Sequence, residues 1–481
     1  MTMSSSISLR GSAFRVLLVG LGMGVAVTAG TQTVTEPSRS LILILAGAIV
    51  GATTLVLAYT RFEVFLLVVL TLRATVDWTK TPPLAVGEQT SSGAVTTAFA
   101  LVFLIAAVVW LLVQYQIGSL DFPSPLAISW LAFVFIGVLS AIAADRPVES
   151  LAESGRIATI VVMLVVLEQF LHTHLRLHRL LTICYLSAIV PLLVVAYQVT
   201  GAGGSVTSEG ISRLRGTFLH PNAFGFYLVI LIIMGVALLP YLTRQVRPLL
   251  LSLVWASTIA LVLTYSRGSW IVLVVGLVVV AKLQSPSILV FMLAAIATLA
   301  ITVPSVSTRL LDLRAESSLA GVQGDSFRWR LDYWSTAIGL ADESPVIGIG
   351  PKMTQYSTHE AKVPHNDFLR AYVETGVLGL IAYAAVIAML IRTARNAVRN
   401  ASSGFDRGVG VGFAGCVAAF IPYSFGGNVM SHVVILWYFV AFAAAAITVS
   451  RSATQPANHV HGQRRPMYRH GSRRSVSLLD R

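Results

Sequence analysis

The polar stretch from Pro304 to Asn366 decides how this sequence is interpreted, because it is the only long hydrophilic segment between two strongly apolar runs. At residues 363–370 the chain reads Val-Pro-His-Asn-Asp-Phe-Leu-Arg and becomes apolar again. Any chemistry that such a hydrophobic chain performs in water is expected in this segment. On both sides of it the sequence has the character of a membrane protein.

The composition supports that assignment. Of 481 residues, 56% are hydrophobic and 11% are charged, and the mean hydropathy is +0.78, whereas soluble domains carry roughly 25% charged residues. In lipid, every backbone polar group must be paired within the protein. Continuous apolar runs of about 20 residues, rather than alternating strands of about ten, favour helices. The predicted fold is therefore all-α, a polytopic bundle of transmembrane helices.

The apolar runs predict about 12 to 14 spans, because two of the runs are short. The candidate spans cover residues 14–30, 41–59, 62–76, 93–113, 126–144, 156–171, 179–199, 222–241, 248–265, 269–283, 287–303, 368–391, 408–425 and 430–449. Residues 1–450 then form the bundle, in which residues 304–366 are one large extracytoplasmic loop that carries short helices.

The basic residues indicate how the bundle is oriented. Short loops rich in Lys and Arg stay in the cytoplasm, which places both termini there and the loops 77–92, 145–155, 200–221 and 304–366 outside the cytoplasmic membrane. The basic tail 451–481 cannot bury a core, so we expect it to be disordered and to lie on anionic lipid. The net charge is +13, and Lys and Arg fall mainly in the short loops between apolar runs and in the tail. This distribution is the one expected of cytoplasmic loops near anionic lipid, so we expect no nucleic-acid partner. Cys184 and Cys416 lie in apolar runs, which excludes a disulfide framework.

Two arginines stand where the charge rule gives no reason for them. Residues 213–222 read Arg-Leu-Arg-Gly-Thr-Phe-Leu-His-Pro-Asn, so Arg213 and Arg215 come just before the outer start of a span. Guanidinium groups bind phosphate through two parallel hydrogen bonds and keep their charge, so an anionic ligand would explain them. Two other interpretations stay open, namely that they reach lipid headgroups or pair with Glu209.

A third arginine lies between two apolar runs. Residues 265–270, Tyr-Ser-Arg-Gly-Ser-Trp, join the runs almost without a loop. A charge at this depth needs a partner or water, so Arg267 is a candidate functional residue. The alternative is a turn residue that extends to the membrane interface.

The large loop contains an amphipathic segment and a bent one. Phe327, Leu331, Trp334 and Ile338 recur at helical spacing, which predicts a short helix on the membrane surface or capping the bundle. Its aromatic side chains are expected to pack in the core. Residues 345–351 follow with two glycines and two prolines, which predict a bent backbone. A role for Gly348 and Gly350 in holding phosphate is only weakly indicated.

His365 lies where the loop re-enters the membrane. An imidazole can accept a proton from a hydroxyl near neutral pH, although a loop histidine is more often a surface residue. His220 is the reserve candidate, and His359 lacks the same position at a span. Asp325, Asp332 and Asp367 are candidates to orient His365 or an arginine.

Taken together, the segments 213–222, 266–270 and 364–369, with Glu374-Thr-Gly376 after them, resemble the O-antigen ligase and polysaccharide polymerase family. The segment from Arg328 to Gly350 is also similar to the large external loop of that family. The resemblance covers about residues 200–390. The expected number of spans and the long basic tail depart from the family pattern.

The resemblance implies an inverting, metal-independent membrane glycosyltransferase that needs no cofactor. Such an enzyme moves a glycan from a polyprenyl diphosphate-linked saccharide donor to a glycan or glycolipid acceptor on the outer face of the membrane. Arg215 and Arg267 would bind the diphosphate, and His365 would contact or activate the acceptor hydroxyl. The remaining candidate substrate-binding residues are Arg213, His220, Asn222, Asn366, Arg328, Arg330 and Arg370.

Several alternatives stay open. Within the family, the acceptor would be a second lipid-linked glycan for a polymerase, another glycolipid or cell-wall glycan for a ligase, or a protein. A transporter or flippase of anionic lipid-linked glycans would use the same arginines without chemistry, and is expected to have charges or broken helices near the middle of the bilayer. A structural scaffold for envelope assembly would tolerate the loss of His365.

Overall fold

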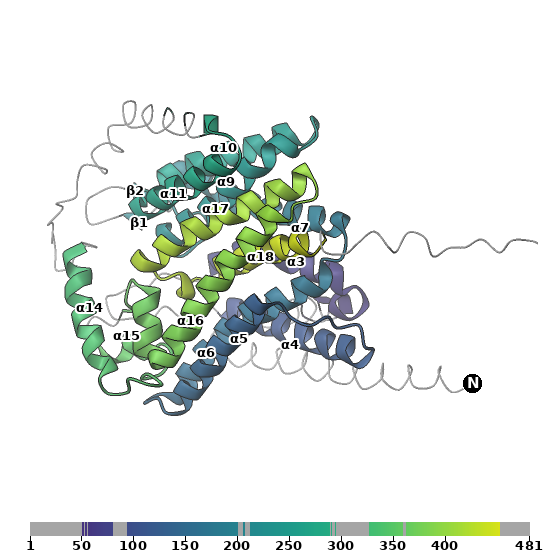
Figure 1. Cartoon of the computed structure of the whole chain (residues 1–481). Helices are drawn as coiled ribbons and strands as arrows, with labels where there is room; N and C mark the ends of the chain where they lie inside the picture. Colours follow the sequence, from purple (N-terminus) through teal and green to yellow (C-terminus); the bar gives the residue numbers. More distant parts are fainter. Residues whose placement is uncertain are drawn as a thin grey trace, which may run out of the picture.

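The computed structural model describes residues 51, 53–54, 56–79, 94–200, 205–206, 212–288, 290, 294, 327–358 and 362–452. These residues form an α-helical bundle with one antiparallel pair of two-residue strands, β1 (Ser205–Val206) and β2 (Ser212–Arg213) (Figure 1). Among them, eight helices are long and apolar enough to cross a membrane. The predicted all-α polytopic fold is confirmed.

The helices follow one another in an up-and-down order along the chain. The elements are α3 (Phe62–Val76), η1 (Asp77–Thr79), α4 (Ala94–Gln116), α5 (Pro125–Ile142), α6 (Pro147–Phe170), α7 (His174–Leu186), α8 (Ile189–Val199), α9 (Pro221–Leu238), η2 (Leu239–Tyr241), α10 (Arg247–Leu263), α11 (Arg267–Leu283), α14 (Phe327–Ala341), α15 (Thr354–Ser357), α16 (Asp367–Arg399), α17 (Gly404–Gly426), η3 (Val429–Ser431) and α18 (Val433–Ser452).

Most predicted spans correspond to a described helix. The predicted spans 62–76, 248–265 and 269–283 form the shorter helices α3, α10 and α11, of 15, 17 and 17 residues. The span predicted at 14–30 and most of those predicted at 41–59 and 287–303 lie outside the described residues, as does nearly all of the tail. The span predicted at 179–199 is divided into α7 and α8, because Pro191 has no N–H to donate to the carbonyl of Ser187.

Two helices occupy the centre of the bundle. Helices α9 and α18 are buried along most of their length, whereas α4 lies at the periphery. Glycines let neighbouring helices approach closely: a Cβ on Gly276 of α11 would lie 2.9 Å from the carbonyl oxygen of Gly415 on α17. Small residues at such crossings are typical of membrane helices, where packing rather than the hydrophobic effect holds helices together.

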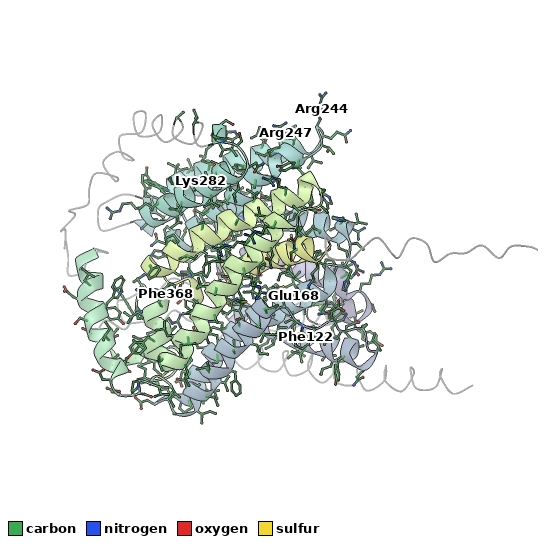
Figure 2. The ribbon with its side chains drawn as sticks, in the orientation of Figure 1. Phe122, Glu168, Arg244, Arg247, Lys282 and Phe368 are labelled. Carbon is green, nitrogen blue, oxygen red and sulfur yellow. The ribbon has the colours of Figure 1, made fainter. Side chains whose placement is uncertain are left out.

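The bundle has two ends with different polar chemistry. We call one the His365 end, at which α5 and α17 end and α6, α9, α11 and α16 begin; Phe368 marks it on the left of Figure 2. The opposite Glu168 end is closed by hydrogen bonds from Ser124 N (2.9 Å) and Arg451 Nη2 (3.2 Å) to Glu168 Oε2.

Helix α14 forms where helical spacing predicted it, but it buries a different face. Leu331 and Ile338 are 46% and 49% exposed, whereas Tyr333, Ala337 and Ala341 are buried. Leu331 and Ile338 therefore face away from the bundle, which fits the prediction of a helix on the membrane surface. On the buried face, Ala337 and Ala341 pack against Val373, with Leu369 and Tyr372 of α16 beside them.

Helix α16 is broken at Gly376, which has φ 66° and ψ −169°. Residues 345–350 supply hydrogen bonds that the helix loses there: Gly350 N donates to Glu374 O (3.0 Å), and Val377 N donates to Pro345 O (2.9 Å). A Cβ on Gly376 would lie 2.1 Å from Val346 O, so only glycine fits. The bent segment predicted after α14 thus packs into a helix break, and the backbone N–H groups of Gly348 and Gly350 are used within the protein.

Candidate functional site

His365 lies immediately before α16 and is half-buried. Its Nδ1 is 3.3 Å from Nδ2 of Asn428, in the turn between α17 and α18. The next residue, Asn366, caps α16, because its Oδ1 accepts from the backbone N of Phe368 (3.0 Å) and Leu369 (3.1 Å). Asn366 therefore fixes where the helix starts, and Asn428 contacts the imidazole.

The turn that carries Asn428 is attached to the first turn of α16. Asp367 is completely buried, and its carboxylate accepts from the backbone N of Val429 (2.9 Å) and of Met430 (3.3 Å). Asp367 was a candidate to orient His365 or an arginine. These contacts show it holding the backbone beside Asn428, while Asp332 is exposed and Asp325 lies outside the described residues.

Two arginines hold the same turn from the other side. Arg370 Nη1 donates to Ser431 Oγ (2.9 Å), and Arg156 of α6 donates to the carbonyl oxygens of Ser431 (2.8 Å) and Met430 (3.1 Å). The turn is thus connected to α6 and α16 through charged side chains. Its position, and with it that of Asn428, depends on this network.

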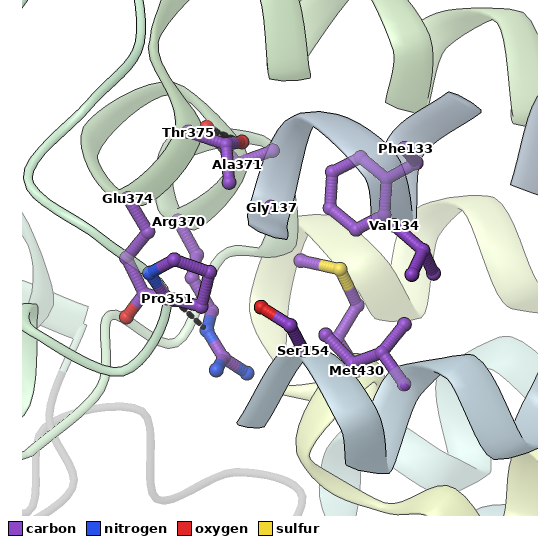
Figure 3. Close-up of a pocket in the computed structure, with 11 residues that line it drawn as sticks. Phe133, Val134, Gly137, Ser154, Pro351, Arg370, Ala371, Glu374, Thr375 and Met430 are labelled. Carbon is purple, nitrogen blue, oxygen red and sulfur yellow. Dashed lines mark hydrogen bonds and ion pairs between the residues drawn. The ribbon is translucent and has the colours of Figure 1, made fainter. Parts of the chain in front are cut away.

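The side-chain contacts of Arg370 are to other residues of the protein. It is 2% exposed, its Nε donates to Glu374 Oε2 (2.8 Å), and its Nη2 donates to Glu153 Oε1 (2.8 Å). Figure 3 shows Arg370 and Glu374 side by side next to Pro351, on the wall of a cavity of about 20 Å³, which is room for about one water molecule. Buried charges persist in proteins when they are paired in this way.

The carboxylates of Glu153 and Glu374 offset the charges of Arg370 and Arg156, whose Nε donates to Glu153 Oε2 (2.7 Å). A neutral, buried cluster cannot attract an anion as an isolated guanidinium does. The geometry favours a structural role for Arg370, in place of the substrate contact expected from the sequence.

Arg213 also holds the protein together. It is 9% exposed; its Nε donates to Thr264 O (2.8 Å) at the end of α10, and its Nη2 donates to Asn222 Oδ1 (2.6 Å) on α9. Arginine is favourable here because the C-terminal end of a helix carries partial negative charge. Glu209, the alternative partner, lies outside the described residues.

Arg215 differs from both. It is half-buried, and its Nη1 donates to the neutral carbonyl oxygen of Leu219 (3.2 Å). Within the described part of the chain, no carboxylate forms an ion pair with it. Since a guanidinium has five N–H donors, Arg215 retains both charge and donors for a ligand.

Arg267 is the first residue of α11 and is half-buried. The preceding Ser266 makes no side-chain cap bond to the helix; its Oγ is 2.9 Å from Ser269 Oγ instead. Unsatisfied N–H groups and the helix dipole make a helix N-terminus favourable for anions. Arg267 therefore adds a charge at an end that already favours a negative ligand.

Tyr423 of α17 joins the predicted segments. Its hydroxyl donates to Asn222 O (2.9 Å), and a Cβ on Gly268, next to Arg267, would lie 3.9 Å from its ring. Helix α17 ends just beyond Tyr423, and Phe425 there stacks on Phe368 of α16, with ring centroids 4.3 Å apart. The structure thus brings the starts of α9, α11 and α16 to one end of the bundle.

The other predicted residues have varied positions. His220 caps α9 through Nδ1, which accepts from Asn222 N (3.1 Å). Arg328 and Arg330 lie in the first turn of α14, but their side chains, like His359, lie outside the described residues. Among the described residues, no three His, Cys, Asp or Glu side chains are grouped as a metal site requires.

Sequence reasoning missed the residues that support this site from a distance. Glu153 and Arg156 lie inside an apolar helix, and Asn428 and Ser431 lie in a short turn. Of these, the two charges within α6 carried a signal, because ionisable residues inside a span are costly and usually functional or paired. At Asn428 the sequence showed no comparable signal.

In the comparison with protein families, the model of the O-antigen ligase family matches residues 251–384. The match includes Arg267, His365 and Gly376, but it begins after Arg213 and Arg215. No curated protein matches the chain. Residues 251–384 confirm the family that the sequence resembles, so this multi-pass membrane protein carries an O-antigen ligase domain and is a membrane enzyme that acts on glycans.

Proposed function

We propose that this protein transfers a glycan from a polyprenyl diphosphate-linked donor to an acceptor hydroxyl, with inversion and without a metal ion. The observation that carries the proposal is the meeting of three segments at the His365 end: the Arg215 loop, the start of α11 and the start of α16. They are joined through Tyr423, Phe425 and Asn428. These contacts support an anion site at the same end of the bundle as the imidazole.

Arg215 and Arg267 act on the donor. In the reaction, the bond between the anomeric carbon and the diphosphate oxygen breaks, and the diphosphate leaves with the bonding electrons. Fixed positive charges stabilise the charge that develops on this leaving group, which is the role a metal ion would otherwise have. The start of α11, where Ser266 makes no side-chain cap bond, adds the positive end of the helix dipole to this stabilisation.

His365 acts on the acceptor. The acceptor oxygen forms its new bond on the opposite face of the anomeric carbon, and its proton passes to the imidazole, which is suited to this transfer near neutral pH. The contact between Asn428 and Nδ1 orients the ring. Asn366 and His220 serve as helix caps that set the positions of their neighbours.

The exposed basic residues support an active site outside the cytoplasm. At the Glu168 end, the exposed Lys and Arg among the described residues are Arg61, Arg179, Arg244, Arg247, Lys282, Arg392, Arg395, Arg399 and Arg407. Arg244 and Arg247 project at the upper right of Figure 2, away from Phe368. By the positive-inside rule this end faces the cytoplasm, so the His365 end faces outward.

A transporter of lipid-linked glycans is the second candidate, because the break in α16 is a feature that transporters use to bind substrate. Here, however, the loop 345–350 fills the break and supplies its hydrogen bonds. The paired charges next to it are neutralised within the protein. Both features favour a fixed scaffold over a moving gate.

The test is an in vitro transfer assay with full-length protein in detergent and chelator, which follows release of polyprenyl diphosphate from a lipid-linked oligosaccharide. We expect His365→Ala to lower the rate by about 10²–10⁴-fold, the usual contribution of a proton-transfer group. His172→Ala, an exposed histidine at the Glu168 end, is the matched control and should keep wild-type activity.

Two outcomes would contradict the proposal. If chelator abolishes release and a divalent cation restores it, the metal-independent mechanism is wrong. If the wild type binds the donor but releases nothing with glycan, glycolipid or protein acceptors, while vesicles containing it move the donor between leaflets, the transporter is the better assignment.

A further inference from the structure

Gln198 holds the backbone of the Arg215 loop. It lies in the last turn of α8 and is 7% exposed. Its Oε1 accepts from the backbone N of Arg215 (3.2 Å) and of Gly216 (3.0 Å), and its Nε2 donates to Gly216 O (3.1 Å). Both ends of one buried carboxamide are therefore used on two consecutive residues.

The turn held by Gln198 has little freedom to move. Gly216 has φ 56°, and a Cβ there would lie 3.0 Å from Phe224 and 3.1 Å from Pro191 O, so glycine is required. Thr217 Oγ1 donates to Ala74 O of α3 (2.6 Å). The backbone at Arg215 is thus fixed by α3, α8 and α9 together, and the direction in which its side chain leaves the backbone is fixed with it.

The chemistry of the carboxamide also matters for the charge. A glutamine satisfies two N–H groups and one carbonyl without adding charge. A carboxylate at the same place would face Gly216 O with an oxygen instead of a donor, and would bring a negative charge to the loop that carries Arg215. A neutral residue leaves the positive potential of the loop intact.

We propose that Gln198 is a positioning residue that aims the Arg215 guanidinium at the diphosphate of the donor. The inference rests on the proposed function, since it assigns Gln198 to the donor half of that site. Gln198 itself touches no reacting atom. It acts through three hydrogen bonds to the loop backbone.

The chain offers a matched control for this residue. Gln169, at the end of α6, is 5% exposed, and its carboxamide grips the backbone of Asp121: Oε1 accepts from Asp121 N (2.9 Å) and Nε2 donates to Asp121 O (3.0 Å). It belongs to the Glu168 end, far along the bundle from Arg215. The same substitution at both positions removes the same kind of contact at opposite ends.

The experiment measures donor KM and kcat for full-length wild type, Gln198→Met and Gln169→Met. Methionine keeps the length of the side chain and removes its hydrogen bonds. We expect Gln198→Met to raise the donor KM by about tenfold to a hundredfold, the effect of a misplaced binding group, with a smaller change in kcat. Gln169→Met should leave the donor KM within about twofold of wild type, because its loop binds no substrate.

A second variant tests the requirement for neutrality. Gln198→Glu keeps an acceptor for both N–H groups and adds a charge, so we expect a donor KM at least as high as that of Gln198→Met at low ionic strength, and a smaller difference from wild type as salt screens the charge. A wild-type KM in Gln198→Glu would overturn this part of the inference.

The outcomes separate this inference from the proposed function. Equal donor KM values in wild type and Gln198→Met, with both enzymes active, would overturn the role of Gln198 and leave the proposed function in place. Equal increases in Gln198→Met and Gln169→Met would show a general effect of lost stability, which also overturns it. A wild type that neither binds nor consumes the lipid-linked donor would instead reject the proposed function.

Discussion

Arg370 and Arg215 lie at the same end of the bundle, but their guanidinium groups meet different partners. Arg370 is 2% exposed and is paired with Glu153 and Glu374. Arg215 is half-buried, and its guanidinium donates to a carbonyl oxygen of its own loop. A carboxylate cancels the charge of an arginine, whereas a carbonyl oxygen satisfies one donor and leaves the charge in place.

The difference teaches how to separate structural from ligand-binding arginines in a membrane protein. In both positions the charge is costly to bury. At Arg370, two carboxylates offset the cost of burying the charge. The resulting cluster of side chains links α6, α16 and the turn 428–431. At Arg215 the fixed backbone and the uncancelled charge are what a site for an anionic ligand needs.

The largest effect that tests the comparison is expected for Arg370→Leu. The substitution leaves Glu374 buried without its cation and Glu153 with Arg156 alone, which should lower the free energy of unfolding by about 3–5 kcal/mol. The measurement is the thermal unfolding midpoint of purified protein in detergent. A stable Arg370→Leu protein that has lost only donor binding would place Arg370 in the substrate site and break the comparison.

Arg215→Ala should lower activity rather than stability, in contrast to Arg370→Leu. We expect transfer to fall by about 10²–10³-fold, as when one group that stabilises developing charge is removed, while the unfolding midpoint stays near that of wild type. Arg215→Lys keeps the charge but not the paired hydrogen bonds, so it should recover part of the rate. If Arg215→Ala instead unfolds the protein and Arg215→Lys restores only stability, the arginine is structural.

Asn428→Leu sharpens the comparison, because it tests whether the Arg370 network acts on the site through the turn 428–431. Loss of the contact with His365 Nδ1 should lower kcat by about tenfold, since an imidazole that is not held reacts less efficiently, while the donor KM stays unchanged. Steady-state kinetics with separate donor and acceptor titrations measure this. A change confined to the donor KM would contradict the placement of Asn428 on the acceptor side.

The smallest effect is expected for exposed arginines at the Glu168 end. Arg244→Ala and Arg247→Ala should change the free energy of unfolding by less than about 0.5 kcal/mol and leave transfer unaltered. Activity and unfolding midpoints of these two variants are the baseline for the others. A loss of donor binding in either variant would show that the arginines of the two ends are not functionally distinct.

Much of the fold was readable from the sequence, because a chain of this hydropathy has few ways to satisfy its backbone in lipid. The apolar runs marked nearly every described helix, and the interruption at Tyr265–Trp270 marked the tight connection between α10 and α11. The spacing of α14 predicted a helix, but it did not identify Tyr333, Ala337 and Ala341 as the residues that this helix buries. Periodicity shows that a helix is amphipathic, but only the shape of its neighbour decides which side chains fit.

What the sequence by itself determined is the class of protein and the residues of interest: a helical membrane protein with arginines and a histidine in segments that resemble one family. The tertiary structure alone decided which arginines are neutralised, because Glu153 and Arg370 are far apart in the chain and meet only through helix packing. It also decided that Asn428 contacts His365 and that Gln198 holds the Arg215 loop. Sequence records which charges exist, but pairing depends on distances that only folding sets.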